Sequence, residues 1–194
     1  MKDLGLDSDT ELMEKVAKED TAAFGEIMRR YQSPLFNFIY RTLSDYGEAE
    51  DLTQETFLGI YNSAKRYKPS AKFTTYLFKI ARNLCLNRLR KRNRFWLFSL
   101  DEEEKIAEIQ AEDSTRPDVI YERKEAAAAI TEALSTLSEN QRMAVVLQRF
   151  HNLSYKEMAE VMGCSVSAVE SLLFRAKQNL KTKLSARFLD NECL

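Results

Sequence analysis

Residues Ser154–Leu180 read SYKEMAEVMGCSVSAVESLLFRAKQNL, and this stretch decides how the C-terminal part of the chain folds. Ser154 and Glu157 have the S-x-x-E spacing of a capping box, which marks the first turn of a helix. Gly163 suits the left-handed position just past a helix end, so this first helix is short. A longer basic helix follows, with apolar residues every three or four positions. This order predicts a helix-turn-helix.

Capping residues extend the helical pattern around this stretch. Ser165 or Ser167 is placed to cap the second helix of the helix-turn-helix. Ser138 and Gln141 form another capping box, which predicts the start of an earlier helix. A run of four alanines before that box strongly favours a further helix. We therefore expect a C-terminal unit made only of helices.

The N-terminal half also predicts helices. Between Asp9 and Arg94, apolar side chains recur mostly at spacings of three and four. We expect Ser33-Pro34 to bend the chain or to begin a new helix, because proline lacks an amide donor and restricts the preceding residue. Asp45-Tyr46-Gly47 predicts a turn between helices. A further amphipathic helix is expected over about residues 74–92.

The composition agrees with an all-α protein. Only five glycines and three prolines occur in 194 residues, and the 44% hydrophobic content can form one moderate core or two small ones. No apolar run reaches the 18 residues of a membrane span, and the N-terminus lacks a signal-peptide core, so we expect a cytoplasmic protein without membrane insertion. Three scattered cysteines and one histidine predict no disulfide framework and no metal site.

The net charge of −1 hides a strong segregation of charge along the chain. Residues 61–94 contain eleven basic side chains and no acidic one, residues 95–118 are mostly acidic, and residues 171–189 are basic again. Two cationic blocks separated by an anionic one indicate two surfaces for polyanions and a spacer. The alternative is that each block is an ordinary solvated helix face.

Four stretches of the chain resemble the extracytoplasmic-function (group 4) sigma factors of bacterial RNA polymerase, which belong to the sigma-70 family. They are Ala23–Ile27 with Arg30-Tyr31, Glu50–Phe57, Phe73–Asn83 and Leu137–Leu184. Together they cover nearly the whole chain in the order of the family, which makes the set far more specific than any one stretch.

The resemblance implies an all-α fold of two small helical domains joined by a flexible acidic linker. Sigma region 2 would occupy residues 1–96, the linker residues 97–120, and region 4 residues 121–194. It also implies promoter-specific initiation of transcription, as in a stress response, with no cofactor. Its implied partners are core RNA polymerase, promoter DNA and an anti-sigma factor.

The acidic segment Glu50–Phe57 matches the family segment that docks on the clamp helices of the largest polymerase subunit; the resemblance implies the beta flap as a second contact. Asp51, Gln54 and Glu55 are three and four residues apart, so they share a helix face and are suited to accept hydrogen bonds from arginines of a partner helix. Leu52 and Leu58 are expected elsewhere on this helix. The alternative is an amphipathic helix with a solvated acidic face.

Residues Tyr61–Arg94 match the part of the family that opens and reads the −10 promoter element. Displaced bases need aromatic or planar surfaces, and the DNA backbone needs cations. An asparagine both donates and accepts, so Asn83 is suited to read a base edge. For Phe73 and Tyr76 a place in the core is the alternative. The expected −10 set is Tyr61, Lys65, Arg66, Tyr67, Lys72, Tyr76, Lys79, Asn83 and Arg90.

The helix-turn-helix matches the unit that reads the −35 element as duplex. A recognition helix in the major groove presents its N-terminal turns to base edges, while flanking cations hold phosphates. Val169, Ala176 and either Leu172 or Leu173 are expected to face the scaffold. The expected −35 set is Ser167, Glu170, Ser171, Phe174, Arg175 and Lys177.

Other classes of function fit less well. No phosphate-binding loop or nucleophile elbow is present, and His151 lies where a turn is expected, so we expect no enzyme and no catalytic residue. A stand-alone helix-turn-helix regulator would need a ligand or dimer domain instead of a basic, aromatic N-terminal unit. A sigma-like decoy that only binds an anti-sigma factor would not need that basic block. Cys164 and Cys193 are either a sensor of redox state or metal, or a buried thiol and a tail residue.

Overall fold

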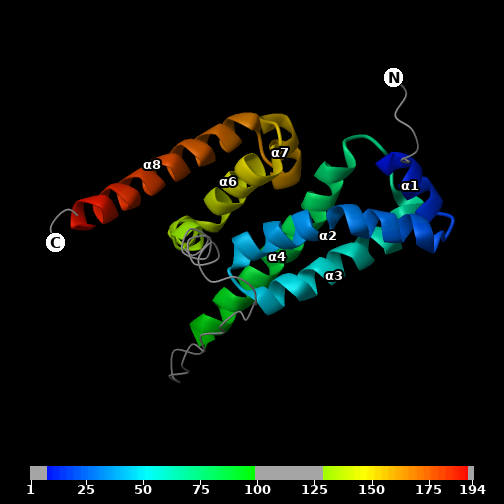
Figure 1. Cartoon of the computed structure of the whole chain (residues 1–194), viewed down its shortest axis with the longest axis horizontal. Coiled ribbons are helices and arrows are strands. Elements are labelled where there is room, and N and C mark those ends of the chain that lie inside the picture. The colour runs from blue at the N-terminus through cyan, green and yellow to red at the C-terminus, as the bar shows by residue number, and fades with distance from the viewer. Residues whose placement is uncertain (1–7, 99–128, 192–194) are drawn as a thin grey trace, which may run out of the picture.

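The computed structural model describes residues 8–98 and 129–191, and Figure 1 shows that these residues form helices joined by short connections. No strand occurs among them, which confirms the expected all-α class. The predicted linker falls almost entirely outside the described residues, as does Cys193. Within the described part of the chain, no helix combines the length and the apolar character that crossing a membrane requires.

The first group of helices, here called the N-terminal unit, has a shared apolar core. Its elements are α1 (Asp9–Val16), α2 (Thr21–Leu43), α3 (Tyr46–Ser63), a 3-10 turn η1 (Ala64–Arg66) and α4 (Phe73–Phe98). Ile27 and Phe38 of α2, Ile60 of α3 and Leu77 of α4 are each fully buried. Burying these side chains stabilises the unit by about 1.5–3 kcal/mol each.

The helix α2 runs without interruption through Pro34, so the expected start of a new helix at this position is wrong. A proline inside a helix costs about 3 kcal/mol, because a hydrogen bond is lost and the ring crowds the preceding turn. The buried side chains of Leu35, Phe38 and Ile39 follow directly and pack into the core. Their burial outweighs the cost of the proline and keeps the helix continuous.

Short polar residues set where α2 and α3 begin and end. The Asp45 side chain accepts a hydrogen bond of 2.9 Å from the amide of Glu48, so Asp45 is the N-cap of α3. Tyr46 and Gly47 therefore belong to the first turn of α3, whereas the sequence predicted a turn between helices. Ser44 takes a left-handed conformation, with φ of 58°, and ends α2.

The second group of helices, here called the C-terminal unit, consists of a helical segment over residues 129–135, α6 (Glu139–His151), α7 (Tyr155–Met162) and α8 (Val166–Asn191). Both predicted capping boxes are present, at Ser138 and at Ser154. Gly163 has a φ of 64°, as the helix-turn-helix pattern predicted. Ser165, rather than Ser167, caps α8, because its hydroxyl accepts from the amide of Ala168 at 3.2 Å.

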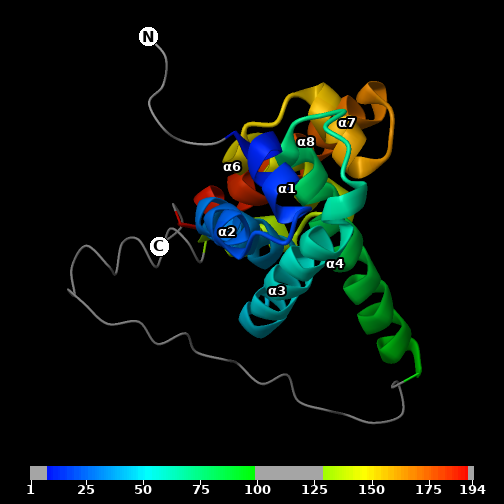
Figure 2. The same cartoon turned by 90° about the vertical axis from the view of Figure 1, so that its right-hand side faces the viewer.

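The two units pack against each other in Figure 2, where α7 lies beside one end of α4. The other main contact is between α6 and α2. Half of the residues of the short helix α7 are buried, including Met158, Val161 and Met162. An eight-residue helix buries so many side chains because it is packed both on its own unit and on α4.

Candidate polymerase and nucleic-acid interfaces

One side of α3 is acidic and exposed. Asp51, Gln54 and Glu55 all lie on the surface, as their shared spacing predicted. The opposite side of α3 is buried in the core through Leu52, Thr53, Thr56, Phe57 and Ile60. This arrangement leaves the carboxylates and the amide free to receive cationic donors from a partner.

Leu58 belongs to the same exposed side, with 59% of its surface accessible. It follows Gln54 and Glu55 by four and three residues, so it lies next to them on the helix surface. The expectation that Leu58 lies elsewhere on the helix is therefore wrong, and the i, i+3, i+4, i+7 spacing from Asp51 is the signal that would have placed it. Below, "the α3 face" means Asp51, Gln54, Glu55 and Leu58.

A hollow between α2 and α3 lies beside the α3 face. Its volume is about 470 Å³, and its lining includes Phe36, Tyr46, Glu50 and Gln54. The rings of Phe36 and Tyr46 lie edge to face with centroids 5.1 Å apart, and Tyr46 is 53% exposed. The hollow thus continues the α3 face with aromatic surface next to a carboxylate.

Four of the predicted −10 residues form one stripe along α4. Tyr76, Lys79, Asn83 and Arg90 are spaced three, four and seven residues apart, which aligns them on one side of the helix. Lys79, Asn83 and Arg90 are exposed, and Tyr76 is partly buried. Arg82 donates a hydrogen bond of 3.3 Å to Oδ1 of Asn83, so the amide nitrogen of Asn83 remains available as a donor.

An aromatic group stands at the start of this stripe. The rings of Tyr67 and Tyr76 lie 5.1 Å apart, and Tyr67 also lies 6.4 Å from Phe73. Phe73 is only 4% exposed, so it is a core residue. The Tyr76 hydroxyl is hydrogen-bonded to that of Ser63. Tyr67 and Tyr76 therefore have fixed rings at the margin of the core, and burial raises the pKa of Tyr67.

The remaining −10 candidates are not brought into the stripe. Tyr61 lies on α3 and packs edge to face on Phe24 at 5.1 Å. Arg66 is exposed in η1. Lys65 forms an ion pair of 2.8 Å with Glu19, and both side chains are well exposed. Nζ of Lys72 forms an ion pair of 2.8 Å with Glu157 of α7, in the C-terminal unit.

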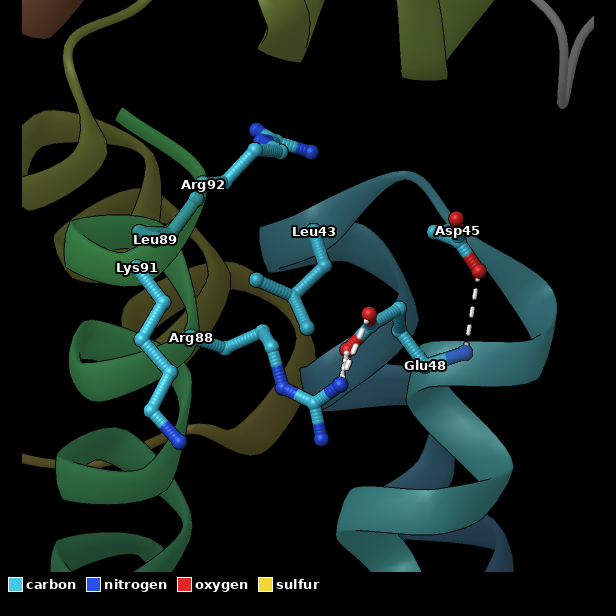
Figure 3. Close-up of a pocket in the computed structure, with 7 residues that line it drawn as sticks. All are labelled: Leu43, Asp45, Glu48, Arg88, Leu89, Lys91 and Arg92. Atoms are coloured by element: carbon cyan, nitrogen blue, oxygen red, sulfur yellow. Dashed lines mark hydrogen bonds and ion pairs between the residues drawn. The ribbon is translucent and has the colours of Figure 1, made fainter. Parts of the chain in front are cut away.

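A hollow of about 500 Å³ lies between the end of α2, the start of α3 and the second half of α4. Figure 3 shows that Arg88 points toward Glu48, and the two are joined by an ion pair of 2.7 Å. Lys91 and Arg92 point away from that pair. Among the described residues neither of these two has an ion-pair partner, so this end of α4 carries uncompensated positive charge.

The recognition helix α8 exposes the predicted −35 residues. Ser167, Glu170, Ser171 and Phe174 are spaced three, four and seven residues apart on one side of α8, and all are exposed. Phe174 is 64% exposed, which is unusual for so large an apolar side chain.

The residues around these four side chains are suited to a DNA-binding surface. Arg175 and Lys177 are exposed beside it. Glu170, Ser171, Phe174 and Arg175 line a shallow hollow of about 470 Å³. On the opposite side, Val169 and Ala176 are fully buried and Leu172 and Leu173 partly so, as expected.

The described residues contain no cluster of histidine, cysteine or carboxylate side chains suited to a metal ion. Cys85 is buried, which raises the pKa of its thiol to about 12. His151 was expected in a turn, but it is the last residue of α6 and is largely buried between the two units. The sequence carries no signal for this position, because the residues around it come from α2 and α4.

Comparison with known proteins shows the family of this chain. Residues 27–95 match the family model "Sigma-70 region 2", and residues 127–180 match "Sigma-70, region 4". The chain is 31% identical over 182 residues to the RNA polymerase sigma-H factor of Pseudomonas aeruginosa, covering 92% of this chain and 94% of that protein. This chain belongs to the extracytoplasmic-function group of the sigma-70 family.

A further relative supports this family assignment. The ECF RNA polymerase sigma-E factor of Haemophilus influenzae is 28% identical over 181 residues, which cover 91% of this chain and 95% of that protein. The sigma factor directs promoter-specific initiation of transcription, as its region 2 and region 4 and its relatives' names show.

Solved structures share its fold. The sigma factor RpoE of Bartonella quintana, crystallised with the anti-sigma factor NepR, superposes with a TM-score of 0.67 at 25% identity, over 84% of this chain and 96% of that one. CnrH, solved with the cytosolic domain of CnrY, superposes with a TM-score of 0.68 at 24% identity, over 93% of this chain and 99% of that one.

Proposed function

We propose that the α3 face is where this sigma factor binds core RNA polymerase, on the clamp helices of the largest subunit. Asp51 and Glu55 supply two exposed carboxylates one helical turn apart, and Leu58 adds apolar surface between them and Tyr61. A partner helix with arginines and an apolar residue at matching spacing complements this surface. The neighbouring hollow at Tyr46 extends the same contact.

The stripe on α4 holds the −10 element. Lys79 and Arg90 face the backbone of the strand, Asn83 reads a displaced base, and Tyr67 and Tyr76 offer ring surface for stacking. The single observation that carries this assignment is the alignment of these side chains on one exposed side of α4. Lys91 and Arg92 continue the positive charge toward flanking phosphates.

The exposed side of α8 reads the −35 element in the major groove. Arg175 is suited to guanine or to a phosphate, Glu170 to the amino group of cytosine, and Phe174 to the methyl group of thymine. Ser167 and Ser171 lie between them and have hydroxyls for either role. Lys177 holds phosphate. The beta flap of the polymerase is the contact that places this unit on the DNA.

These roles divide the chain into residues 1–96, which bind polymerase and the −10 element, and residues 121–194, which bind the −35 element. Residues 97–120 join the two. The protein works by binding alone, without a cofactor, in the cytoplasm. An anti-sigma factor is its regulatory partner, since the similar RpoE was solved together with NepR.

Run-off transcription with purified core polymerase tests these assignments. The full-length protein is expected to start transcripts at a defined site on cognate upstream fragments, whereas core polymerase alone does not. Asn83→Ala is expected to reduce open-complex formation without weakening binding to core. Asn37→Ala, at a partly exposed residue of α2, is the matched control. Normal open-complex formation by Asn83→Ala would contradict the assignment on α4.

Free protein is expected to bind promoter DNA weakly, because specificity belongs to the holoenzyme. A gel-shift experiment with the protein alone distinguishes a sigma factor from a stand-alone helix-turn-helix regulator. Tight, sequence-specific binding without polymerase would favour the regulator and contradict the proposal.

A further inference from the structure

The short helix α1 is joined to α2 through one carboxylate. Oδ1 of Asp9, the first residue of α1, accepts a hydrogen bond of 3.0 Å from Nη1 of Arg30. Oδ2 of Asp9 accepts a hydrogen bond from the hydroxyl of Tyr31. Arg30 and Tyr31 are neighbours on α2 and belong to neither the α3 face nor the stripe on α4. Both oxygens of Asp9 are therefore bound by donors of the adjacent helix, one of them charged.

A second carboxylate fixes the guanidinium of Arg30. Nε of Arg30 donates a hydrogen bond of 2.7 Å to Oε1 of Glu26, one turn earlier on α2. The Arg30 side chain is only 19% exposed, so water screens these contacts less than it screens a surface ion pair. Glu26, Arg30, Asp9 and Tyr31 thus form one connected network, in which each side chain helps to orient the next.

The ring of Tyr31 extends this network to the aromatic group at the start of the stripe on α4. Its centroid lies 5.0 Å from that of Phe73, the first residue of α4. Phe73 in turn lies 6.4 Å from Tyr67 and 6.5 Å from Tyr76. Burial, and secondarily the hydrogen bond with Asp9, raises the pKa of Tyr31, so its hydroxyl stays protonated and remains a donor. Aromatic rings at these separations restrict one another's orientation.

The segment that carries Tyr67 is also supported by α1. The turn η1, which ends one residue before Tyr67, packs on α1, and its Ala64 is buried. The pKa of Tyr67 is raised first by burial and then by the charge of Asp9, so the two side chains are close enough to interact. Lys65 of η1 pairs with Glu19, but both side chains are well exposed, so this pair contributes little. The main support of Tyr67 therefore comes from Asp9 and the apolar packing around it.

We propose that Asp9 and Tyr31 are positioning residues for the −10 element. Through Phe73 they hold the rings of Tyr67 and Tyr76 in the orientation that receives displaced bases, without touching the DNA themselves. A stacking surface that is ordered before binding loses less conformational entropy when the base arrives. Tyr67 lies between η1 and α4, outside any helix, so this order must come from packing by other elements. The inference rests on the proposed function, because it uses the stacking role assigned to Tyr67 and Tyr76.

The affinity of the holoenzyme for single-stranded DNA tests this role, with the non-template strand of a cognate upstream fragment as the probe. Tyr31→Phe keeps the ring on Phe73 and the net charge, and it removes only the hydroxyl that donates to Asp9. It is expected to weaken binding of the strand about five-fold, a partial loss of one stacking contact. Asp9→Asn should also weaken it, although the lost negative charge favours DNA binding, because the new amide group places a donor against Arg30 or Tyr31.

Two further measurements separate positioning from other causes of weak binding. Tyr31→Phe should keep the wild-type dependence on salt, because no phosphate contact is lost, whereas Lys79→Ala should lower it by about one phosphate contact. Binding to core polymerase should be unchanged in Tyr31→Phe, because it uses a different surface. Glu14→Gln, at an exposed residue of α1, is the matched control and should bind the strand as the wild type does. Wild-type strand affinity in Tyr31→Phe and Asp9→Asn, or loss of strand and core binding together, would overturn the proposal.

Hydrogen exchange in the free protein tests the support of Tyr67 without DNA. The amide of Tyr67 donates at 3.1 Å to the main-chain oxygen of Ala64, and it should exchange faster in Tyr31→Phe than in the wild type or in Glu14→Gln. Equal exchange in all three would contradict the support by Tyr31. Failure of the wild-type holoenzyme to bind the strand would instead contradict the proposed function of α4, and the exchange result would stand.

Discussion

Arg142 of α6 donates a hydrogen bond of 2.9 Å to the main-chain oxygen of Thr42, which lies 100 residues earlier in the chain at the end of α2. A cation is favoured here, because the carbonyl groups at a helix C-terminus carry partial negative charge. The same guanidinium donates to the main-chain oxygens of Ser135 and Leu137 within its own unit. Arg142 therefore joins the end of α2 to the connection between the first helical segment of the C-terminal unit and α6.

Arg142→Ala is expected to weaken the contact between the units by about 1–3 kcal/mol, since it removes a charged hydrogen bond and leaves the carbonyl group of Thr42 unpaired. Hydrogen exchange at the end of α2, including the amide of Ser44, should become faster. Arg149→Ala changes an exposed arginine of the same helix and should leave this exchange unchanged. Equal exchange in both variants would show that the hydrogen bond contributes nothing.

The contact between the two units at His151, whose ring lies 4.5 Å from that of Phe78 and 5.9 Å from that of Phe38, should weaken in mild acid. Burial, and secondarily the charge of Arg41, lowers the pKa of His151 to about 4 from its ordinary 6.5. The contact therefore keeps its full stability above pH 6.5 and loses it as the pH falls toward 4. At pH 5 the loss is at most about 2 kcal/mol.

Small-angle X-ray scattering at pH 7.5 and pH 5 measures whether the loss of this contact increases the radius of gyration. Glu157 cannot cause it, because its hydrogen bonds with Lys72 and Ser154 lower its pKa to about 2. His151→Phe has no titrating group at this position and should keep the same radius of gyration at both pH values. Acid expansion of His151→Phe equal to that of the wild type would contradict the role of the histidine.

On the α3 face, Glu55→Lys is expected to weaken binding to core polymerase by about 1–3 kcal/mol, because it opposes the cations of the partner. Leu58→Ala should weaken it by a smaller amount through lost apolar contact. Both residues are exposed, so the thermal stability of the free protein should not change. Glu14→Lys on α1 is a matched charge reversal, and equal affinity for all three variants would contradict the assignment.

Arg175 and Lys177 provide a test of whether a side chain of α8 recognises a specific base or only attracts the DNA phosphates. Arg175→Ala is expected to cost about 1–3 kcal/mol and to relax the preference at one position of the −35 element. Lys177→Ala should weaken binding to all promoters alike and lower the salt dependence by about one phosphate contact. Run-off transcription on promoters with single −35 substitutions, repeated at several salt concentrations, distinguishes the two effects.

Alanine substitutions at Gly163 and Gly25 are expected to change the stability of the protein in opposite directions. An alanine at Gly163 meets no atom within 4 Å, but the φ of 64° there strains any residue with a Cβ, so Gly163→Ala should destabilise the protein by about 1 kcal/mol. Gly25 lies inside α2, also in open space, and Gly25→Ala should stabilise the protein by about 0.5–1 kcal/mol. Thermal unfolding followed by circular dichroism measures both, and opposite signs are required.

Local signals in the sequence predicted much of the fold. Helix ends are set by local interactions, such as the capping boxes at Ser138 and Ser154 and the glycine at position 163. They can therefore be predicted without knowledge of contacts between distant residues. The exposed sides of α3 and α8 follow from spacing alone. Pro34 misled the prediction, because the core packing that overrides its local cost comes from other helices.

The contact between the two units could not be predicted from the sequence. Phe38, Phe78 and His151 come from three helices, and neither their spacing nor their composition indicates that they meet. For the same reason, the sequence did not separate Lys72 from the stripe on α4. The roles of the −10, −35 and polymerase-binding residues, and the domain boundaries, stay predictions.

The two described thiols differ in a way that provides a ready-made probe. Cys85 is fully buried and its thiol stays protonated, so it resists alkylation. Cys164 is partly exposed at the junction of α7 and α8, and its thiol lies near enough to Arg82 of α4 to interact electrostatically. In a Cys193→Ser variant, an environment-sensitive fluorophore attached at Cys164 by maleimide chemistry would therefore lie beside the contact between α7 and α4. Its emission would follow any separation of the two units in real time.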